Sequence, residues 1–155
     1  AWYPGKRVGF DVRLRPTVRL SSGFSALDDR QGRRNHGFAK GAEIDAYLAE
    51  ALRHPNRDAM ASGDRTREAV YGDWLRQRFD DAATIEEARL VRFQRSVAAR
   101  GHKAQEAPDI VMQGTVSIGD TDRFVERLAK GIGRHRAYGY GMLMLRPPRS
   151  PKADR

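Results

Sequence analysis

The stretch VGFDVRLRPTVRL, residues 8–20, decides the fold of this chain. Apolar side chains occupy alternate positions along it, namely Val8, Phe10, Val12, Leu14, Val18 and Leu20. Polar side chains fall between them, namely Asp11, Arg13, Arg15 and Arg19. Because successive side chains of a strand point to opposite faces, this period of two predicts a strand with one buried face. Pro16 has no N–H to give to a neighbouring strand, so it indicates an edge position, a bulge or a break into two strands.

Two helices are predicted to follow this strand. Residues 42–54 carry apolar side chains at helical spacing, and Pro55 ends the segment. Asp64 is a suitable N-cap for a second helix over roughly 66–79. The apolar side of that helix holds Val70, Trp74 and Leu75. Before the helices, residues 21–41 predict a loop or an irregular hairpin.

Two strands joined by a turn are predicted next. Residues 88–98 alternate in polarity, with the side chains of Val91, Phe93 and Val97 expected to face inward. Residues 99–108 are polar and predict a turn. Residues 110–118 alternate again and predict the third strand of the sheet.

A helix and a last strand complete the pattern. Asp120 is expected to cap a helix that runs to about Lys130, where Gly131 ends it. The buried stripe of this helix is expected to hold Phe124, Val125 and Leu128. Residues 138–146 are apolar on both faces, which indicates a central, covered strand.

The order of these elements is strand, helix pair, strand, strand, helix, strand. It predicts an α+β, ferredoxin-like βαββαβ fold with an extra helix in the first crossover. The expected domain spans residues 7–147, and the basic tail at 148–155 is expected to be flexible. Four aromatic residues are expected in its core, namely Trp74, Phe79, Phe93 and Phe124. Tyr138 and Tyr140 are also expected to pack in the core, with stacking on a nucleobase as the alternative.

The basic composition indicates an anionic partner. The 155 residues contain 29 Lys and Arg against 20 Asp and Glu, a net charge of +9, and the isoelectric point is about 10.4. Most of the basic residues are Arg, whose planar guanidinium binds phosphate through two parallel hydrogen bonds. This charge favours nucleic-acid binding, although a GC-rich genome also encodes arginine-rich surfaces that bind nothing.

Composition also excludes several kinds of site. The chain has no Cys, so disulfides and thiolate metal sites are ruled out, and a reducing cytoplasm fits. It has no run of about 18 apolar residues that predicts a membrane span. The histidines show no i, i+4 pair, so neither a metal nor another cofactor is predicted; they are His36, His54, His102 and His135.

The segment KGIGRHRAYGYG, residues 130–141, is the most informative motif. Glycines allow main-chain N–H groups to converge without Cβ clashes, and Arg134 and Arg136 add positive charge. The segment is therefore predicted to hold an RNA phosphate backbone. A dinucleotide-binding fingerprint does not fit, because that motif follows a strand and opens a helix. A plain glycine-rich helix terminus and turn remains an open alternative.

The segment GIGRHRAYGYGMLMLRP resembles the C-terminal glycine-rich loop and last strand of the RAMP proteins, most closely those of the CasE family of subtype I-E CRISPR systems. Other segments agree with that family in order, from about residue 7 to residue 147; they are FDVRLRPTVRL, KGAEIDAYL, EAVYGDWL, ARLVRF and MQGTVSI.

The resemblance implies a two-domain endoribonuclease. CasE-type proteins have two tandem ferredoxin-like domains, bind the hairpin of a CRISPR repeat transcript and cut it without metal, through attack by a ribose 2′-hydroxyl. They then remain in the Cascade complex. This chain resembles the second domain, so residues 1–6 are expected to be a linker from a missing first domain. Because that domain carries the catalytic histidine, no catalytic residue is predicted here.

The implied partners are the repeat RNA hairpin, other Cascade subunits and the N-terminal ferredoxin-like domain. The predicted RNA contacts are Arg13, Arg15, Arg19, Arg33, Arg34, His36, Lys40, Lys130, Gly131, Gly133, Arg134, His135, Arg136, Gly139 and Gly141. Two alternatives stay open. One is a non-catalytic RAMP scaffold subunit that grips CRISPR RNA, and the other is a small ferredoxin-like enzyme that binds an anionic metabolite.

Overall fold

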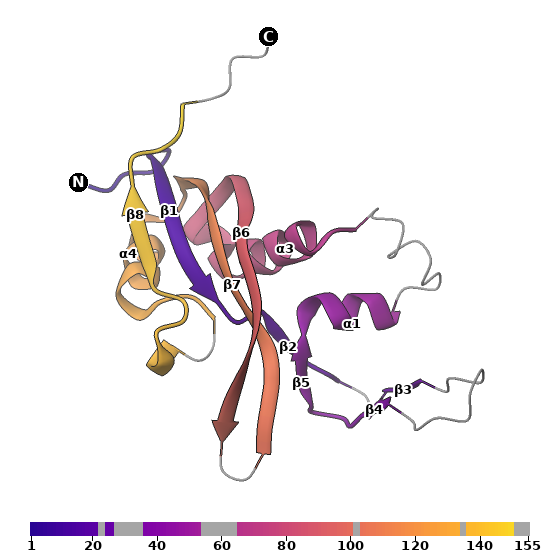
Figure 1. Ribbon diagram of the computed structural model, residues 1–155. Helices are drawn as coiled ribbons and strands as arrows, with labels where there is room; N and C mark the ends of the chain where they lie inside the picture. The colour runs from indigo at the N-terminus through magenta and orange to yellow at the C-terminus, as the bar shows by residue number, and fades with distance from the viewer. Residues whose placement is uncertain (22–23, 27–35, 54–64, 101–102, 134–135, 151–155) are drawn as a thin grey trace.

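The computed structural model describes residues 1–21, 24–26, 36–53, 65–100, 103–133 and 136–150. Its main sheet has four strands in the order β6-β7-β1-β8, and neighbouring strands are antiparallel (Figure 1). These strands are β1 (Arg7–Leu14), β6 (Ala83–Arg100), β7 (Lys103–Ile118) and β8 (Leu143–Arg146). This is the strand order of a ferredoxin-like fold, so the predicted α+β class is confirmed.

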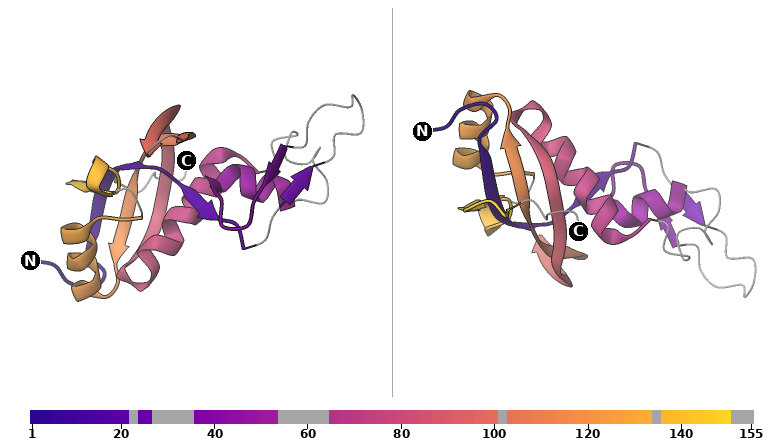
Figure 2. Two further views of the ribbon diagram at one scale, coloured as in Figure 1. Left: turned by 90° about the horizontal axis from the view of Figure 1, so that it is seen from below. Right: turned by 90° about the horizontal axis from the view of Figure 1, so that it is seen from above.

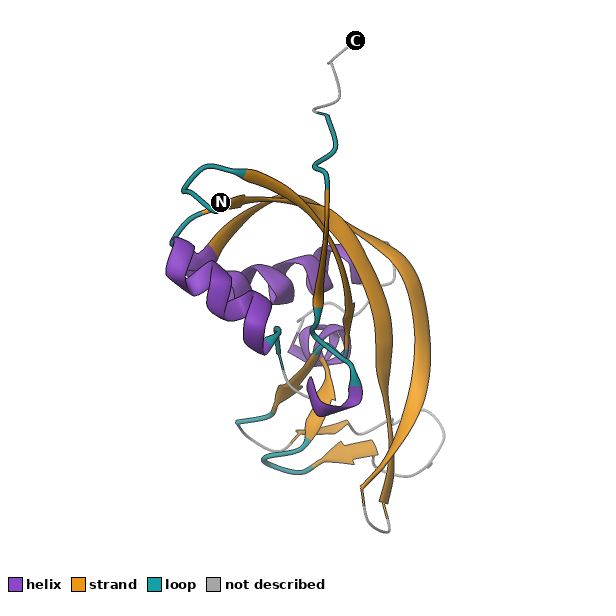
Figure 3. Cartoon of the chain, turned by 90° about the vertical axis from the view of Figure 1, so that its left-hand side faces the viewer, coloured by secondary structure: helices purple, strands orange, loops and turns teal. Residues whose placement is uncertain are grey.

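Strand β1 forms the centre of the core as its alternation predicts. The predicted inward residues are buried, namely Val8, Phe10, Val12 and Leu14. Helices α3 (Arg67–Phe79) and α4 (Thr121–Lys130) cover this face, and none of the helices in the described residues lies on the opposite face (Figures 2 and 3). The sheet therefore has one buried and one open face.

The two covering helices are fixed by polar caps. Asp120 caps α4 as predicted, since its carboxylate accepts the Arg123 N–H at 3.0 Å. Thr66, rather than the predicted Asp64, caps α3 by accepting the Ala69 N–H at 3.2 Å. Three of the expected core aromatics are buried, namely Trp74, Phe79 and Phe124. Val125 is exposed, which contradicts its predicted place in the buried stripe of α4.

A smaller unit follows β1. Pro16 breaks the first strand, and β2 (Thr17–Arg19) pairs with β5 (Glu43–Asp45) in a separate sheet. Helix α1 (Ala46–Arg53) begins only after β5, so the helix predicted from residue 42 starts too early. A third sheet pairs β3 (Phe24–Ala26) with β4 (His36–Phe38).

The side chain of Arg67 joins this unit to the main sheet. Its guanidinium lies between the rings of Tyr47 and Phe93, at 4.3 and 4.4 Å from their centroids. It also forms an ion pair with Asp45 at 2.8 Å and donates to the Tyr71 hydroxyl at 2.6 Å. Burial raises the pKa of the Tyr71 hydroxyl, so this group stays protonated. It donates a hydrogen bond to Asp45 Oδ1 at 2.8 Å.

Strands β6 and β7 form a long hairpin that runs past the end of β1 (Figure 1). Their pairing continues to Arg100 and Lys103, so the chain does reverse within the predicted turn over 99–108, but the strands extend well into that range. The predicted inward residues of β6 are exposed, namely Val91, Phe93 and Val97. A register shift between Leu90 and Arg92 interrupts the alternation at Val91.

The last strand is shorter than predicted and lies at an edge. Only Leu143–Arg146 pair with β1, and Met144 is 65% exposed, so the expected central, covered strand is wrong. The preceding residues Arg136–Tyr138 form a short 3₁₀ helix instead. Tyr138 is exposed rather than in the core, whereas Tyr140 is half-buried.

The turn between α4 and β8 depends on positive φ angles. Gly131, Gly133, Gly139 and Gly141 all adopt φ between 78° and 85°. A Cβ at Gly141 would overlap the carbonyl oxygen of Ile132, whereas a Cβ at Gly139 would meet open space. The two positions therefore share one backbone requirement and differ in packing.

We expect Gly139→Ala to cost about 1 kcal/mol of unfolding free energy, because a left-handed conformation penalises any Cβ. Gly141→Ala should cost about 3 kcal/mol, since overpacking adds to that penalty. Urea denaturation of both variants measures the difference. Equal losses of unfolding free energy in the two variants would mean that the Ile132 carbonyl moves away from a Cβ at Gly141 without cost.

Candidate nucleic-acid interface

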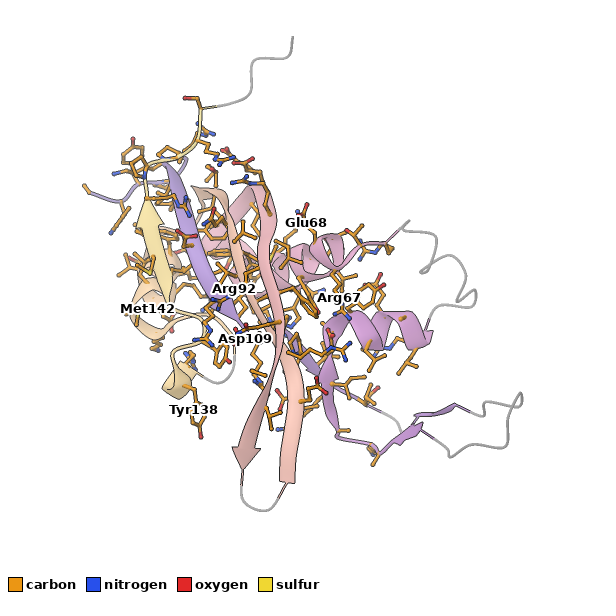
Figure 4. The ribbon with its side chains drawn as sticks, in the orientation of Figure 1. Arg67, Glu68, Arg92, Asp109, Tyr138 and Met142 are labelled. Carbon is orange, nitrogen blue, oxygen red and sulfur yellow. The ribbon has the colours of Figure 1, made fainter. Side chains whose placement is uncertain are left out.

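The open face of the sheet carries a cluster around the carboxylate of Asp109. This side chain is 0% exposed. It accepts Arg13 Nε at 2.9 Å and Arg13 Nη2 at 2.6 Å, and it accepts Gln94 Nε2 at 3.1 Å. Arg92 Nη2 lies 3.9 Å from it. The cluster therefore joins β1, β6 and β7 at the point where the hairpin leaves the sheet (Figure 4).

Asp109 remains ionised in this setting. The hydrogen bonds from Arg13 lower the pKa of its carboxyl to about 2, with a further contribution from Gln94 and against the opposing effect of burial. The same contact raises the pKa of Arg13. Both partners are thus charged at any physiological pH. The side chains of Arg13 and Arg92 are 45% and 50% exposed, so each also reaches solvent.

Arg15 lies beside this cluster but is buried. It is 5% exposed, so its predicted place on an exposed polar face is wrong. Its Nη1 donates to Ser96 Oγ at 2.9 Å. The Tyr140 ring lies 4.9 Å from the guanidinium carbon of Arg13 and 5.9 Å from that of Arg15. The arginines of the first strand and the glycine-rich turn, predicted separately, therefore meet at Tyr140.

Four main-chain amides in the described part of the glycine-rich turn are bonded within the protein rather than open to a phosphate. The Gly131 and Gly139 N–H groups donate to carbonyls of Arg127 and Arg136 within the turn region. The Gly141 N–H donates to the Arg13 carbonyl at 2.7 Å. The Ile132 N–H donates to the Gly141 carbonyl at 2.8 Å. These four amides close the turn and attach it to β1, as the alternative of a plain structural turn requires.

A hollow of about 360 Å³ lies beside the turn, near the C-terminal ends of α3 and α4. Its lining residues are Gln77, Arg78, Asp80, Arg127, Gly131, Ile132, Gly133 and Arg136. Arg136 Nη1 donates to the Lys130 carbonyl at 3.0 Å, and Arg127 Nε donates to the Arg78 carbonyl at 3.0 Å. These arginines therefore cap helix C-termini, where carbonyls lack helical partners. The ammonium of Lys130 pairs with Glu126 at 2.9 Å.

The other predicted contacts lie elsewhere. Arg19 and Lys40 are exposed in the smaller unit, where the Gly41 N–H donates to the Leu20 carbonyl. His36 is in β4, and its side chain lies outside the described residues. Four predicted contacts also lie outside them, namely Arg33, Arg34, Arg134 and His135. So do His54, His102 and most of the tail at 148–155.

Sequence reasoning missed Arg92, Gln94 and Asp109. All three belong to the hairpin, whose register shifts between Leu90 and Arg92. The Leu90 N–H, beside that shift, donates to Glu68 Oε2 of α3 at 3.1 Å. Alternation places Arg92 on the outward face, where the register also puts it, but the pattern of a single strand does not link it to Asp109 or Arg13. An acid between Pro108 and Ile110, opposite an arginine-bearing strand, was the available signal.

Among the described residues, no three His, Asp or Glu side chains lie close enough to hold a metal ion. Within that same part of the chain, no helix combines the length and apolar character that crossing a membrane requires.

The lowered pKa of Asp109 predicts how stability depends on pH. An ordinary Asp has a pKa of 3.8, against about 2 here, so the ion pair stabilises fully above about pH 4 and is lost as pH falls further. We expect the unfolding free energies of the wild type and of Asp109→Asn to differ by a constant amount from neutral pH to about pH 4, and to converge below it. Urea denaturation at each pH measures this. Convergence in the range where histidine titrates would contradict the assignment.

The fold is similar to those of solved CRISPR proteins. The CRISPR endoribonuclease Cse3 bound to 19 nt RNA matches with a TM-score of 0.60 and 20% identity, over 95% of this chain and 58% of that one. Cas6e from Escherichia coli str. K-12 matches with a TM-score of 0.56 and 18% identity, over 95% and 63%. A chain of a CRISPR RNA-guided surveillance complex matches with a TM-score of 0.52 and 19% identity, over 93% and 60%. This chain thus spans about three fifths of the length of these proteins.

No curated protein matches the chain by sequence. The family model described as CRISPR associated protein matches residues 1–147. Because that match covers most of the chain, the chain belongs to the family of CRISPR associated proteins, which confirms the resemblance drawn from the sequence.

Proposed function

We propose that this chain is the RNA-gripping part of a CasE-type endoribonuclease that binds the hairpin of CRISPR repeat RNA. The observation that carries the proposal is that two half-exposed arginines, Arg13 and Arg92, gather around the single carboxylate of Asp109. One negative charge leaves such a cluster positive overall. Arginine forks of this kind suit the phosphates of an A-form hairpin, which proteins read mainly by shape.

The proposal divides the work of the whole enzyme between two domains. Residues 7–147 form the second ferredoxin-like domain and residues 1–6 the linker to a first one. The first domain supplies the catalytic histidine, and a ribose 2′-hydroxyl attacks the neighbouring phosphate without metal. The limited share of the solved relatives that this chain spans supports this division. The processed RNA stays bound in the Cascade complex of the cytoplasm, which the likeness to the surveillance-complex chain supports.

The proposed contacts lie in two groups. Arg13 forms one group with the glycine-rich turn, in which Lys130 and Arg136 serve by charge. Arg15 adds positive charge to this group from its buried place beside Ser96 and Tyr140. Arg19 and Lys40 form the second group on the smaller unit. The predicted contacts outside the described residues remain part of the proposal.

The division of work predicts binding without cleavage. We expect this chain to bind a CRISPR repeat stem-loop in an electrophoretic shift assay and to leave it intact. Supplying the first domain should restore cleavage in the presence of EDTA, because the proposed attack needs no metal. Cleavage by this chain alone would refute the proposed location of the catalytic base. Binding without cleavage even with the first domain would favour the scaffold alternative.

The second group predicts a change in salt dependence. The double variant Arg19→Gln with Lys40→Gln should flatten the plot of log affinity against log salt by about two units, since each contact releases about one counterion. Arg76→Gln with Arg123→Gln is the matched control, because it removes the same charge from exposed sites on the helix-covered side. Fluorescence anisotropy with a labelled stem-loop measures both. Equal slopes would remove Arg19 and Lys40 from the interface.

A further inference from the structure

We infer that Asp109, assisted by Gln94, is a positioning residue that holds Arg13 and Arg92 as a phosphate-binding pair at the base of the β6-β7 hairpin. The inference rests on the proposed function and adds to it the residues that bind one particular phosphodiester group of the RNA. It also assigns a direct contact with an RNA phosphate to Arg92, which the sequence analysis did not predict.

The pair lies at a junction of three strands. Gln94 is opposite Asp109 in the β6-β7 register, one step beyond the last β1-β7 pair, Leu14 with Ile110. Asp109 and Arg92 lie close together where the hairpin emerges from the sheet (Figure 4). Tyr138, in the 3₁₀ helix of the glycine-rich turn, lies below them in the same view. A phosphate bound here would contact the rigid sheet and the projecting hairpin together.

The contacts of Asp109 leave part of the Arg13 guanidinium for a ligand. The ion pair engages Nε and Nη2 of Arg13. A guanidinium has five N–H donors in a planar fork, so the edge that includes Nη1 is not used by this pair. Arg13 and Arg92 are both about half exposed and approach the same carboxylate, Arg13 on both oxygens and Arg92 within 3.9 Å of Oδ1. They therefore share one site.

Asp109 would favour RNA binding by restraining the flexible side chain of Arg13 before the RNA arrives. Arginine has several rotatable bonds, and fixing them when a ligand binds costs conformational entropy. Here the bidentate pair fixes the Arg13 guanidinium in advance, and the Tyr140 ring supports it at 4.9 Å. The Gln94 amide occupies the remaining acceptor position of Oδ2. Such preorganisation strengthens binding although the carboxylate itself repels phosphate.

Asp109→Asn tests this inference because the two possible effects have opposite signs. If charge alone governed binding, removal of a carboxylate from a basic surface would tighten RNA binding. If Asp109 positions the arginines, the dissociation constant for a fluorescein-labelled CRISPR repeat stem-loop should rise about tenfold, the loss of roughly one charged hydrogen bond. The salt slope should also flatten by about one unit. Tighter binding by Asp109→Asn would overturn the inference.

Three further variants separate positioning from folding. Asp73→Asn removes an exposed carboxylate from α3 and should leave the dissociation constant within about twofold. Arg92→Gln changes an exposed side chain, so it should fold even if Asp109→Asn does not, and it should weaken binding about tenfold. Arg92→Lys should recover the salt slope but only part of the affinity, because an ammonium lacks the fork.

The outcomes distinguish this inference from the proposed function. Wild-type affinity in Arg92→Gln would overturn the inference and leave the proposed function intact. A wild-type chain that does not bind the stem-loop at low salt would overturn both. Thermal melts by circular dichroism report whether each variant is folded.

Discussion

The buried ion pair between Arg13 and Asp109 is the interaction on which the arrangement of the open face depends. A carboxylate that is fully removed from solvent must be matched by hydrogen bonds, or its burial would oppose folding. Arg13 of β1 and Gln94 of β6 supply those bonds to a residue of β7. The first strand, the long hairpin and the position of the neighbouring arginines are thereby fixed together. Removing Arg13 would leave the buried carboxylate of Asp109 without its main partner, whereas Arg13 on its own still reaches solvent.

The glycine-rich turn supports the position of Arg13. Its amides close the turn internally, and one of them bonds to the carbonyl of Arg13. The turn also delivers Tyr140 against the guanidinium groups of Arg13 and Arg15. The N–H groups of Gly131, Gly139 and Gly141 are therefore used to shape the backbone. Charge in this part of the molecule comes from side chains, which the turn holds in register with the sheet.

The sequence predicts the fold well wherever one face of an element is buried. The alternation from Val8 to Leu14 identifies the central strand, and Asp120 and Gly131 mark the ends of α4. Prediction fails in the hairpin beyond β1, where solvent on both sides removes the alternation and bulges shift the register. It fails again at residues 138–142, since apolar composition does not distinguish an edge from a covered strand. The candidate site was therefore found only in part. Arg13 follows from the pattern of one strand, whereas Asp109 and Arg92 come together only through pairing between strands.

We propose above all that RNA meets the chain at the arginines around Asp109. Nuclear magnetic resonance of arginine Nε–H groups during titration with a CRISPR repeat stem-loop tests it most directly, because each guanidinium reports on its own contacts. The account predicts that the signals of Arg13 and Arg92 move with the bound fraction while those of Arg76 and Arg123, on the helix-covered side, stay in place. Movement of the helix-side signals with Arg13 and Arg92 unchanged would contradict it.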